Sequence, residues 1–223
     1  MFVYLTLVGL FFLCWLFFFL SRKDLRTEML VSSIVVWLFA FFDYLAQPQY
    51  WHPPTFFSIP IGIEGFLFAF CFSGIAAVIY EEIAGKRLRK IREQNATKII
   101  HWLIAVFILF ASLIGSFLFH INIMLTLVPL LAVGAVLIGL TRPDLRLPMI
   151  YSGLTFGLLY GLLFFLWMTI FPTSQQWWNL EIFWWLTIGG VPLGEVLFGF
   201  AFGAFWGPLY EFLFGYRLVR NRT

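Results

Sequence analysis

Residues 2–23 read FVYLTLVGLFFLCWLFFFLSRK, an apolar run of helical length that ends in two cations. A helix needs about 20 apolar residues to cross the hydrocarbon core of a bilayer, and this run supplies them. The cations follow the apolar run instead of preceding it, and no small-residue cleavage site follows, so the segment does not match a secretory signal peptide. We therefore expect a retained membrane-spanning helix.

The rest of the chain repeats this pattern. Of 223 residues, 62% are hydrophobic, 22% are aromatic and 11% are charged, a composition whose apolar surface a water-soluble protein cannot cover. Apolar runs of spanning length, roughly 20 residues each, occur at about 2–20, 29–46, 60–80, 99–119, 122–140, 149–171 and 191–213. The predicted fold class is an all-α integral membrane protein with about seven transmembrane helices.

The positive charges give this prediction an orientation. All 14 Lys and Arg residues follow the first, third, fifth or seventh predicted span, and such loops lie on the cytoplasmic side. We expect a multi-pass protein of the cell membrane with its N-terminus outside and its C-terminus in the cytoplasm. The net charge of +3 then reflects topology, so membrane lipid is an expected partner and nucleic acid is not. The basic run at 86–98 is expected to be a helix end at the inner surface.

Two sequence patterns recur in the same order. Residues 22–29, RKDLRTEM, resemble residues 142–149, RPDLRLPM, and residues 66–70, FLFAF, resemble residues 196–200, VLFGF. Internal repeats are common in membrane folds. The predicted organisation is a first three-span repeat at 1–83, a basic cytoplasmic loop with a linking span at 84–121, and a second three-span repeat at 122–223. The two three-helix repeats would be parallel and joined by an extra helix.

Carboxyl groups in the outer half are the candidate reactive groups. Asp43, Glu64 and Glu195 lie on the predicted outer side, where the sequence places no Lys or Arg. An unpaired carboxyl in apolar surroundings retains its proton, because burial penalises the charged form. These three residues are therefore candidate catalytic acids. The structural alternative is that they bind backbone groups freed by Pro60, Pro192 and nearby glycines.

Aromatic residues of the same half could bind an apolar substrate and stabilise a cation on their ring faces. The structural alternative is contact with lipid. No nucleotide-binding glycine motif and no clustered His or Cys occurs, so neither a cofactor nor a metal is expected. Glycines at 153, 157 and 161 and at 199, 203 and 207 predict a close contact between two helices. The candidate substrate-binding residues are Trp37, Tyr44, Trp51, Tyr160, Trp167 and Trp206.

These motifs resemble the membrane-embedded lycopene cyclase domains of the heterodimeric bacterial, archaeal and fungal type. The segment Asp43-Tyr44-Leu45-Ala46 with Trp51, and the run from Pro60 to Glu64 before a Phe-rich helix, resemble the first unit of that family. The run Pro192-Leu193-Gly194-Glu195 before Val196-Leu197-Phe198 resembles the second unit. Each copy keeps one Glu where the family has an acidic pair.

The resemblance implies a carotenoid cyclase-like enzyme, an isomerase that closes an acyclic end group by acid catalysis without redox change. Two alternatives remain open. One is a polyprenyl-lipid transferase that uses the inner arginines, although the sequence has no Asp-rich Mg²⁺ motif. The other is a non-catalytic lipid- or carotenoid-binding protein derived from cyclases. A retinal-binding receptor is disfavoured because no Lys follows Lys98. The sequence does not indicate the oligomeric state.

Overall fold

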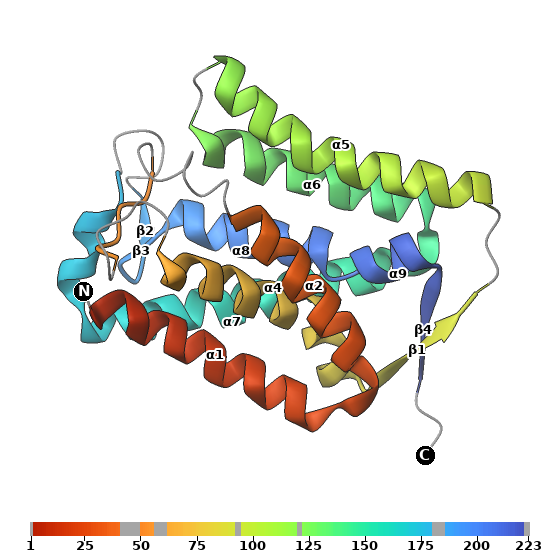
Figure 1. Cartoon of the computed structure of the whole chain (residues 1–223), viewed down its shortest axis with the longest axis horizontal. Coiled ribbons are helices and arrows are strands. Elements are labelled where there is room, and N and C mark those ends of the chain that lie inside the picture. The colour runs from red at the N-terminus through yellow and green to blue at the C-terminus, as the bar shows by residue number, and fades with distance from the viewer. Residues whose placement is uncertain are drawn as a thin grey trace.

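The computed structural model describes residues 2–40, 50–55, 62–91, 95–119, 122–179 and 186–220. Most of its helices lie side by side along the long axis of the molecule (Figure 1). Three short 3-10 helices of the described residues join them, η1 (Lys23–Leu25), η3 (Pro143–Leu145) and η4 (Pro172–Trp177). The α-helices of the described residues are α1 (Phe2–Ser21), α2 (Arg26–Phe39), α4 (Ile63–Ala84), α5 (Asn95–Phe119), α6 (Ile123–Thr141), α7 (Arg146–Ile170), α8 (Leu193–Trp206) and α9 (Leu209–Phe214).

Six helical segments of the described residues are long and apolar enough to cross a membrane. They coincide with six of the predicted spans, so the predicted all-α, multi-pass membrane class is confirmed. The remaining predicted span, at 29–46, begins as α2. This helix has 14 residues up to Phe39, fewer than the roughly 20 needed for a crossing, and residues 41–49 lie outside the described residues. The seventh span stays a prediction.

The glycines of α7 and α8 bring these two helices into close contact. A methyl group at Gly203 would lie 2.7 Å from the backbone oxygen of Ser152, and one at Gly153 would lie 3.0 Å from Cβ of Ala204. Larger residues would therefore force the helices apart. Gly161 differs, because a methyl group there would meet no atom within 4 Å. The predicted close contact is confirmed around Gly153 and Gly203.

Residues 86–90 of the basic run form a strand, so the prediction of a helix end was wrong there, whereas residues 95–98 of the same run begin α5. Gly85 adopts a left-handed conformation, with φ of 59°, and ends α4. The following strand β1 (Lys86–Lys90) pairs antiparallel with β4 (Tyr216–Arg220). This ribbon lies at the opposite end of the bundle from the start of α1 (Figure 1). A second ribbon, β2 (Thr187–Ile188) with β3 (Val191–Pro192), precedes α8.

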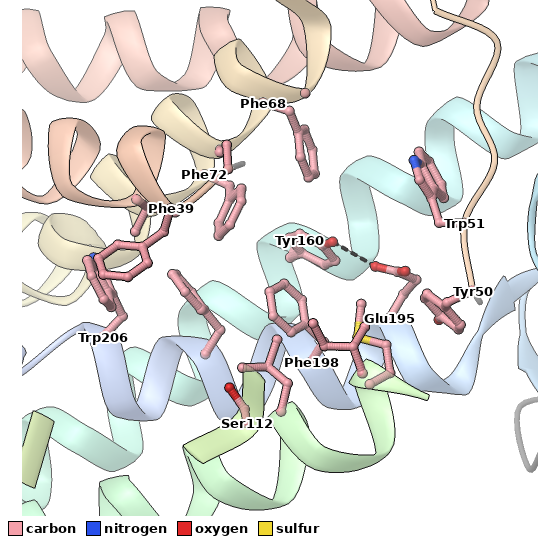
Figure 2. Close-up of a pocket in the computed structure, with 18 of the residues that line it drawn as sticks. Phe39, Tyr50, Trp51, Phe68, Phe72, Ser112, Tyr160, Glu195, Phe198 and Trp206 are labelled. Carbon is pink, nitrogen blue, oxygen red and sulfur yellow. Dashed lines mark hydrogen bonds between the residues drawn. The ribbon is translucent and has the colours of Figure 1, made fainter. Parts of the chain in front are cut away.

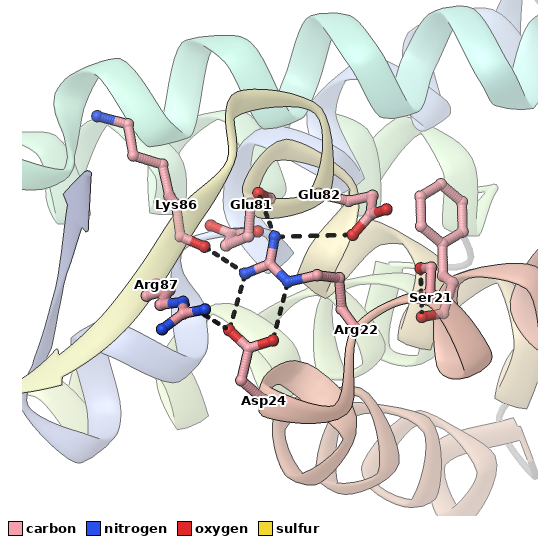
Figure 3. A network of polar contacts seen from close by, with 8 residues as sticks. Ser21, Arg22, Asp24, Glu81, Glu82, Lys86 and Arg87 are labelled. Atoms are coloured by element: carbon pink, nitrogen blue, oxygen red, sulfur yellow. Dashed lines mark hydrogen bonds and ion pairs between the residues drawn. The ribbon is translucent and has the colours of Figure 1, made fainter. Parts of the chain in front are cut away.

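Arg22 ties the start of η1 to the end of α4 (Figure 3). Its guanidinium donates to both carboxylate oxygens of Asp24, each at 2.8 Å. It also donates to the backbone oxygens of Lys86, at 2.6 Å, and of Glu81, at 3.3 Å. The hydrogen bonds from Arg22 lower the pKa of Asp24 below its usual value. Two segments that are distant in sequence, residues 22–24 and 81–86, are therefore joined by one cation.

Arg142 makes the corresponding contacts in the second half of the chain. It donates to both carboxylate oxygens of Asp144, at 2.9 and 2.8 Å. It reaches the backbone oxygens of Tyr216, at 2.8 Å, and Glu211, at 3.5 Å. The side chain of Arg146 donates to the oxygen of Gly139 at 2.8 Å, as Arg26 does to Phe19 at 2.7 Å. Matching hydrogen bonds thus accompany the matching sequences, while the domain limits at 83 and 121 stay predictions.

Candidate functional site

A cavity of about 230 Å³ lies among the helices, away from the arginine networks. Its walls come from α1, α2, α4, α5, α6, α7 and α8 and from the segment at 50–51. Among the described residues that line it, Glu195 is the one with a carboxyl group. The remaining lining side chains are almost all aliphatic or aromatic, as Figure 2 shows. The cavity is therefore an apolar chamber with one acidic group.

Glu195 owes its place to the start of α8. Proline has no backbone N–H to leave unpaired and is suited to a helix start, and Pro192 stands directly before the first helical residue, Leu193. Glu195 then occupies the first turn, where the helix dipole favours a carboxylate. Its side chain is buried, with 4% of its surface exposed. The first turn of α8 thus holds the carboxyl in the wall of the cavity.

Two neighbours hold the carboxyl by hydrogen bonds. The Tyr160 hydroxyl lies 2.7 Å from Oε2, and the Trp178 indole Nε1 donates to Oε1 at 3.0 Å. An indole N–H can only donate, whereas a phenol hydroxyl can donate or accept. Oε1 must therefore accept, and a proton on the carboxyl would sit on Oε2, shared with Tyr160.

Tyr50 is a third polar neighbour of this carboxyl (Figure 2). Its side chain is fully buried. Burial, and next the charge of Glu195, raise the pKa of Tyr50, so its hydroxyl stays protonated at physiological pH. The three polar neighbours of the carboxyl are thus neutral groups that can donate hydrogen bonds.

Aromatic rings form most of the surface around this polar group. The Trp51 and Trp178 ring centroids are 4.1 Å apart in an edge-to-face arrangement. Tyr160 packs against Phe164, with centroids 4.7 Å apart, and against Phe198, at 5.8 Å. Edge-to-face and tilted packing leaves some ring faces directed at the space between them. Such faces are electron-rich and attract positive charge.

The predicted site residues that the structure describes divide into two groups, those that line the cavity and those that lie away from it. Glu195, Trp51, Tyr160 and Trp206 line the same cavity, although they come from two helices and one connecting segment. Asp43 and Tyr44 lie outside the described residues. The structure therefore brings together four of the predicted residues.

Three other predicted residues lie away from the cavity lining. Trp167 is buried, and its Nε1 donates to the backbone oxygen of Val3 and to Thr6 Oγ1, each at 3.0 Å. Trp37 is 42% exposed and packs against Phe66. Trp37 therefore fits the alternative of a lipid-facing aromatic, and Trp167 fits a packing role.

Glu64 is the third of these residues. It is buried in the first turn of α4, with 1% of its surface exposed. A methyl group at Gly62 would meet the Glu64 carboxyl and would lie 2.9 Å from Cβ of Thr55. The adjacent Gly65 lines the cavity, whereas Glu64 is absent from the described lining. Its catalytic role stays a prediction.

Tyr50 and Trp178 are the two polar neighbours of the carboxyl that the candidate list from the sequence omits, although Tyr50 is one of the aromatic residues of the outer half. The two are brought together by backbone pairing between distant connections: His52 N–H donates to Trp177 O at 2.7 Å, and Asn179 N–H donates to Tyr50 O at 2.8 Å. Nothing local in either segment encodes this pairing.

A second group of acids lies beyond the cavity, near the arginine networks. Glu28, Glu81 and Glu211 are buried, each with at most 1% of its surface exposed, and their charges interact. Arg22 and Arg142 bind the backbone oxygens of Glu81 and Glu211. Among the described residues no group of three His, Cys, Asp or Glu side chains could hold a metal ion. This acidic group belongs to the junction of α2, α4 and α9.

Comparison with known proteins finds one similarity, in the second half of the chain. Residues 122–213 match the family model described as lycopene cyclase. No match was found among curated proteins or among solved structures. The matched segment contains α6 to α9 and therefore Glu195 with both of its hydrogen-bond donors. Residues 122–213 of this multi-pass membrane protein are thus similar to the lycopene cyclase family.

Proposed function

We propose that the protein is a carotenoid cyclase-like enzyme and that Glu195 is its proton donor. The observation that carries the proposal is a buried carboxyl held by Tyr160 and Trp178 in an aromatic cavity. The match of residues 122–213 to the lycopene cyclase family supports the same reaction class. The substrate would be an acyclic isoprenoid polyene dissolved in the bilayer.

The first step would be proton transfer from Glu195 Oε2 to a terminal double bond. A new C–H bond forms, the π bond is consumed, and a tertiary carbocation results. A neighbouring double bond attacks that cation and closes the ring, which moves the positive charge to a ring carbon. Loss of a proton from an adjacent carbon restores a double bond. The product is an isomer of the substrate, so no oxidant or reductant is required.

The surroundings suit each charge in turn. The carboxylate left after proton transfer accepts hydrogen bonds from Tyr160 and Trp178, which stabilise its charge. Ring faces of the cavity stabilise the carbocation, and exclusion of water prevents its capture as an alcohol. The Glu195 carboxylate can take back the final proton. One group would thus act first as acid and then as base.

The test is expression in a host that accumulates an acyclic carotenoid, followed by chromatography of the pigments. The wild type is expected to form a cyclic isomer, and Glu195→Gln is expected to lower the yield by about 10²-fold or more, because general acids contribute about 10²- to 10⁴-fold. Glu82→Gln is the matched control, since Glu82 lies on α4 beside Arg22 and far from the cavity lining. Its yield is expected to equal that of the wild type.

Glu64 is tested in the same assay. Glu64→Gln is expected to lower the yield less than Glu195→Gln, because the neighbouring Gly65, and not Glu64, lines the cavity. A wild type that forms no cyclic product, or a fully active Glu195→Gln variant, would contradict the proposal. Acyclic pigment that copurifies unchanged would favour the non-catalytic binding protein instead.

A further inference from the structure

A second cavity adjoins the first on the side away from Glu195. It has a volume of about 150 Å³ and is bounded by α2, α5, α8 and α9. Phe39, Leu109 and Trp206 line both cavities. These three side chains, one each from α2, α5 and α8, therefore form a neck between the two spaces.

The first cavity is small for a long polyene. Sites that enclose a whole drug-sized ligand measure roughly 300–1,000 Å³, whereas this cavity measures about 230 Å³. Glu195 lies on one side of it, and Phe39 with Trp206 lies on the other (Figure 2). A molecule whose end group reaches Glu195 must therefore extend past the neck.

The lining of the second cavity is apolar and suits a hydrocarbon chain. Its lining contains the hydroxyl side chains of Ser32 and Tyr210, and otherwise aliphatic and aromatic residues. Burial of apolar chain in such a space contributes about 0.8 kcal/mol per methylene. A polar or charged tail would instead lose its hydration without compensation. The occupant is therefore an apolar chain continuous with the group in the first cavity.

We propose that the second cavity binds the trailing part of a long linear polyene while one end group reacts at Glu195. This inference rests on the proposed function, since it assigns the substrate class of the same site. Phe39, Leu109 and Trp206 then determine specificity by requiring a narrow, flat chain at the neck. Long acyclic polyenes fill both cavities, and short ones fill the first alone.

The neck also contains an open hydrogen-bond donor. Trp206 is 3% exposed, and its Nε1 has no hydrogen-bond partner among the described residues. A buried donor without an acceptor costs about 1–3 kcal/mol. The π electrons of a conjugated chain are weak acceptors for an N–H group. A polyene suits this position better than a saturated chain of the same length.

The experiment fills the second cavity without touching the first. Ala105 lies on α5 and is 3% exposed. It lines the second cavity and not the first. The probes are lycopene and a truncated acyclic polyene with the same end group and half the length. For Ala105→Phe we expect the ratio of lycopene to short-polyene turnover to fall by at least about tenfold, the discrimination typical of a hydrophobic pocket. Less lycopene should copurify with the variant.

Two further variants make the result decisive. Leu103→Phe adds a similar ring on the outer face of α5, where Leu103 is 63% exposed, and should leave the ratio unchanged. Ser32→Leu fills the second cavity from α2 and should lower the ratio as Ala105→Phe does. An unchanged ratio in both filling variants, or equal loss of both substrates in both, would overturn the inference.

Failure of the proposed function gives a different pattern. A wild type that turns over neither polyene would refute cyclisation, and copurification would then test the second cavity alone. Retention of lycopene by the wild type and Leu103→Phe, with loss from Ala105→Phe and Ser32→Leu, would still support the binding inference. Equal retention by all four proteins would refute it.

Discussion

Tyr160 illustrates how a single hydroxyl can influence which oxygen of a buried carboxyl carries the proton. Its oxygen lies 2.7 Å from Glu195 Oε2, the oxygen left to carry a proton when Trp178 occupies Oε1. Tyr160→Phe removes this hydroxyl and keeps the ring. We expect cyclisation to fall by about 10- to 100-fold, because a hydrogen bond to a charged group contributes about 1.5–3 kcal/mol.

The same assay contains its own control for Tyr160→Phe. Tyr151 lies on the same helix, is 47% exposed and stacks on Tyr80, so Tyr151→Phe removes a hydroxyl that is far from the cavity. Its turnover should match the wild type. Equal turnover of Tyr160→Phe and Tyr151→Phe would show that the hydroxyl of Tyr160 has no part in the reaction.

Site residues were predictable from the sequence where one residue carried the signal. Glu195 stood out because it is a carboxyl in an apolar span on a side without cations, and Tyr160 and Trp51 because they are large rings near that acid. Trp178 could not be assigned, since its contact with Glu195 depends on pairing between residues 50–52 and 177–179. Such pairing is decided by tertiary structure, and no local pattern reports it.

At the scale of elements, the contact of α7 with α8 depends on missing side chains. Gly203→Ala would place a methyl group 2.7 Å from the Ser152 backbone oxygen. Backbone atoms cannot yield as a flexible side chain can, so we expect a loss of about 1–3 kcal/mol of stability. The measurement is the unfolding midpoint of the purified protein in detergent.

Gly161→Ala is the matched control, because Gly161 belongs to the four-residue glycine series of α7, the helix that packs against Gly203. A methyl group there meets no atom within 4 Å, and alanine favours a helix over glycine by up to about 1 kcal/mol. This variant should be as stable as the wild type or more stable. A Gly203→Ala protein that unfolds at the same midpoint as Gly161→Ala would disprove the close-packing argument.

Helices and strands were predictable from the sequence where residues close together in the chain determine them, and not where pairing with distant residues does. Runs of about 20 apolar residues must be helical in a bilayer, and six of them appear as such in the described residues. Strand β1 was missed because a run of cations has no strand pattern. Its conformation follows from the left-handed turn at Gly85 and from pairing with the distant residues Tyr216–Arg220.

The whole molecule separates its charges along the bundle axis. Arg22 and Arg142 and the basic strand β1 lie at the end where β1 pairs with β4, and Glu195 lies in the apolar cavity away from them (Figures 1 and 3). Charge pairing at one end ties the loops together. At the other end, the carboxyl has neutral hydrogen-bond donors, and none of the described residues that line its cavity is a cation.

This separation predicts the orientation of the protein in the membrane. Positively charged loops remain in the cytoplasm, so β1 should face inward and η4 outward. Cysteines placed at exposed positions report the side directly: Arg89→Cys on β1 and Gln176→Cys on η4. The background would carry Cys14→Ala and Cys71→Ala, which removes the two native thiols.

In intact cells, a membrane-impermeant maleimide should label Gln176→Cys and leave Arg89→Cys unlabelled. After permeabilisation it should label both, which shows that Arg89→Cys is reactive once the reagent reaches it. The reverse pattern in intact cells would place the arginine networks outside and Glu195 toward the cytoplasm. In that arrangement the polyene end group would have to reach the acid from the inner leaflet, so the labelling also decides from which leaflet the substrate reacts.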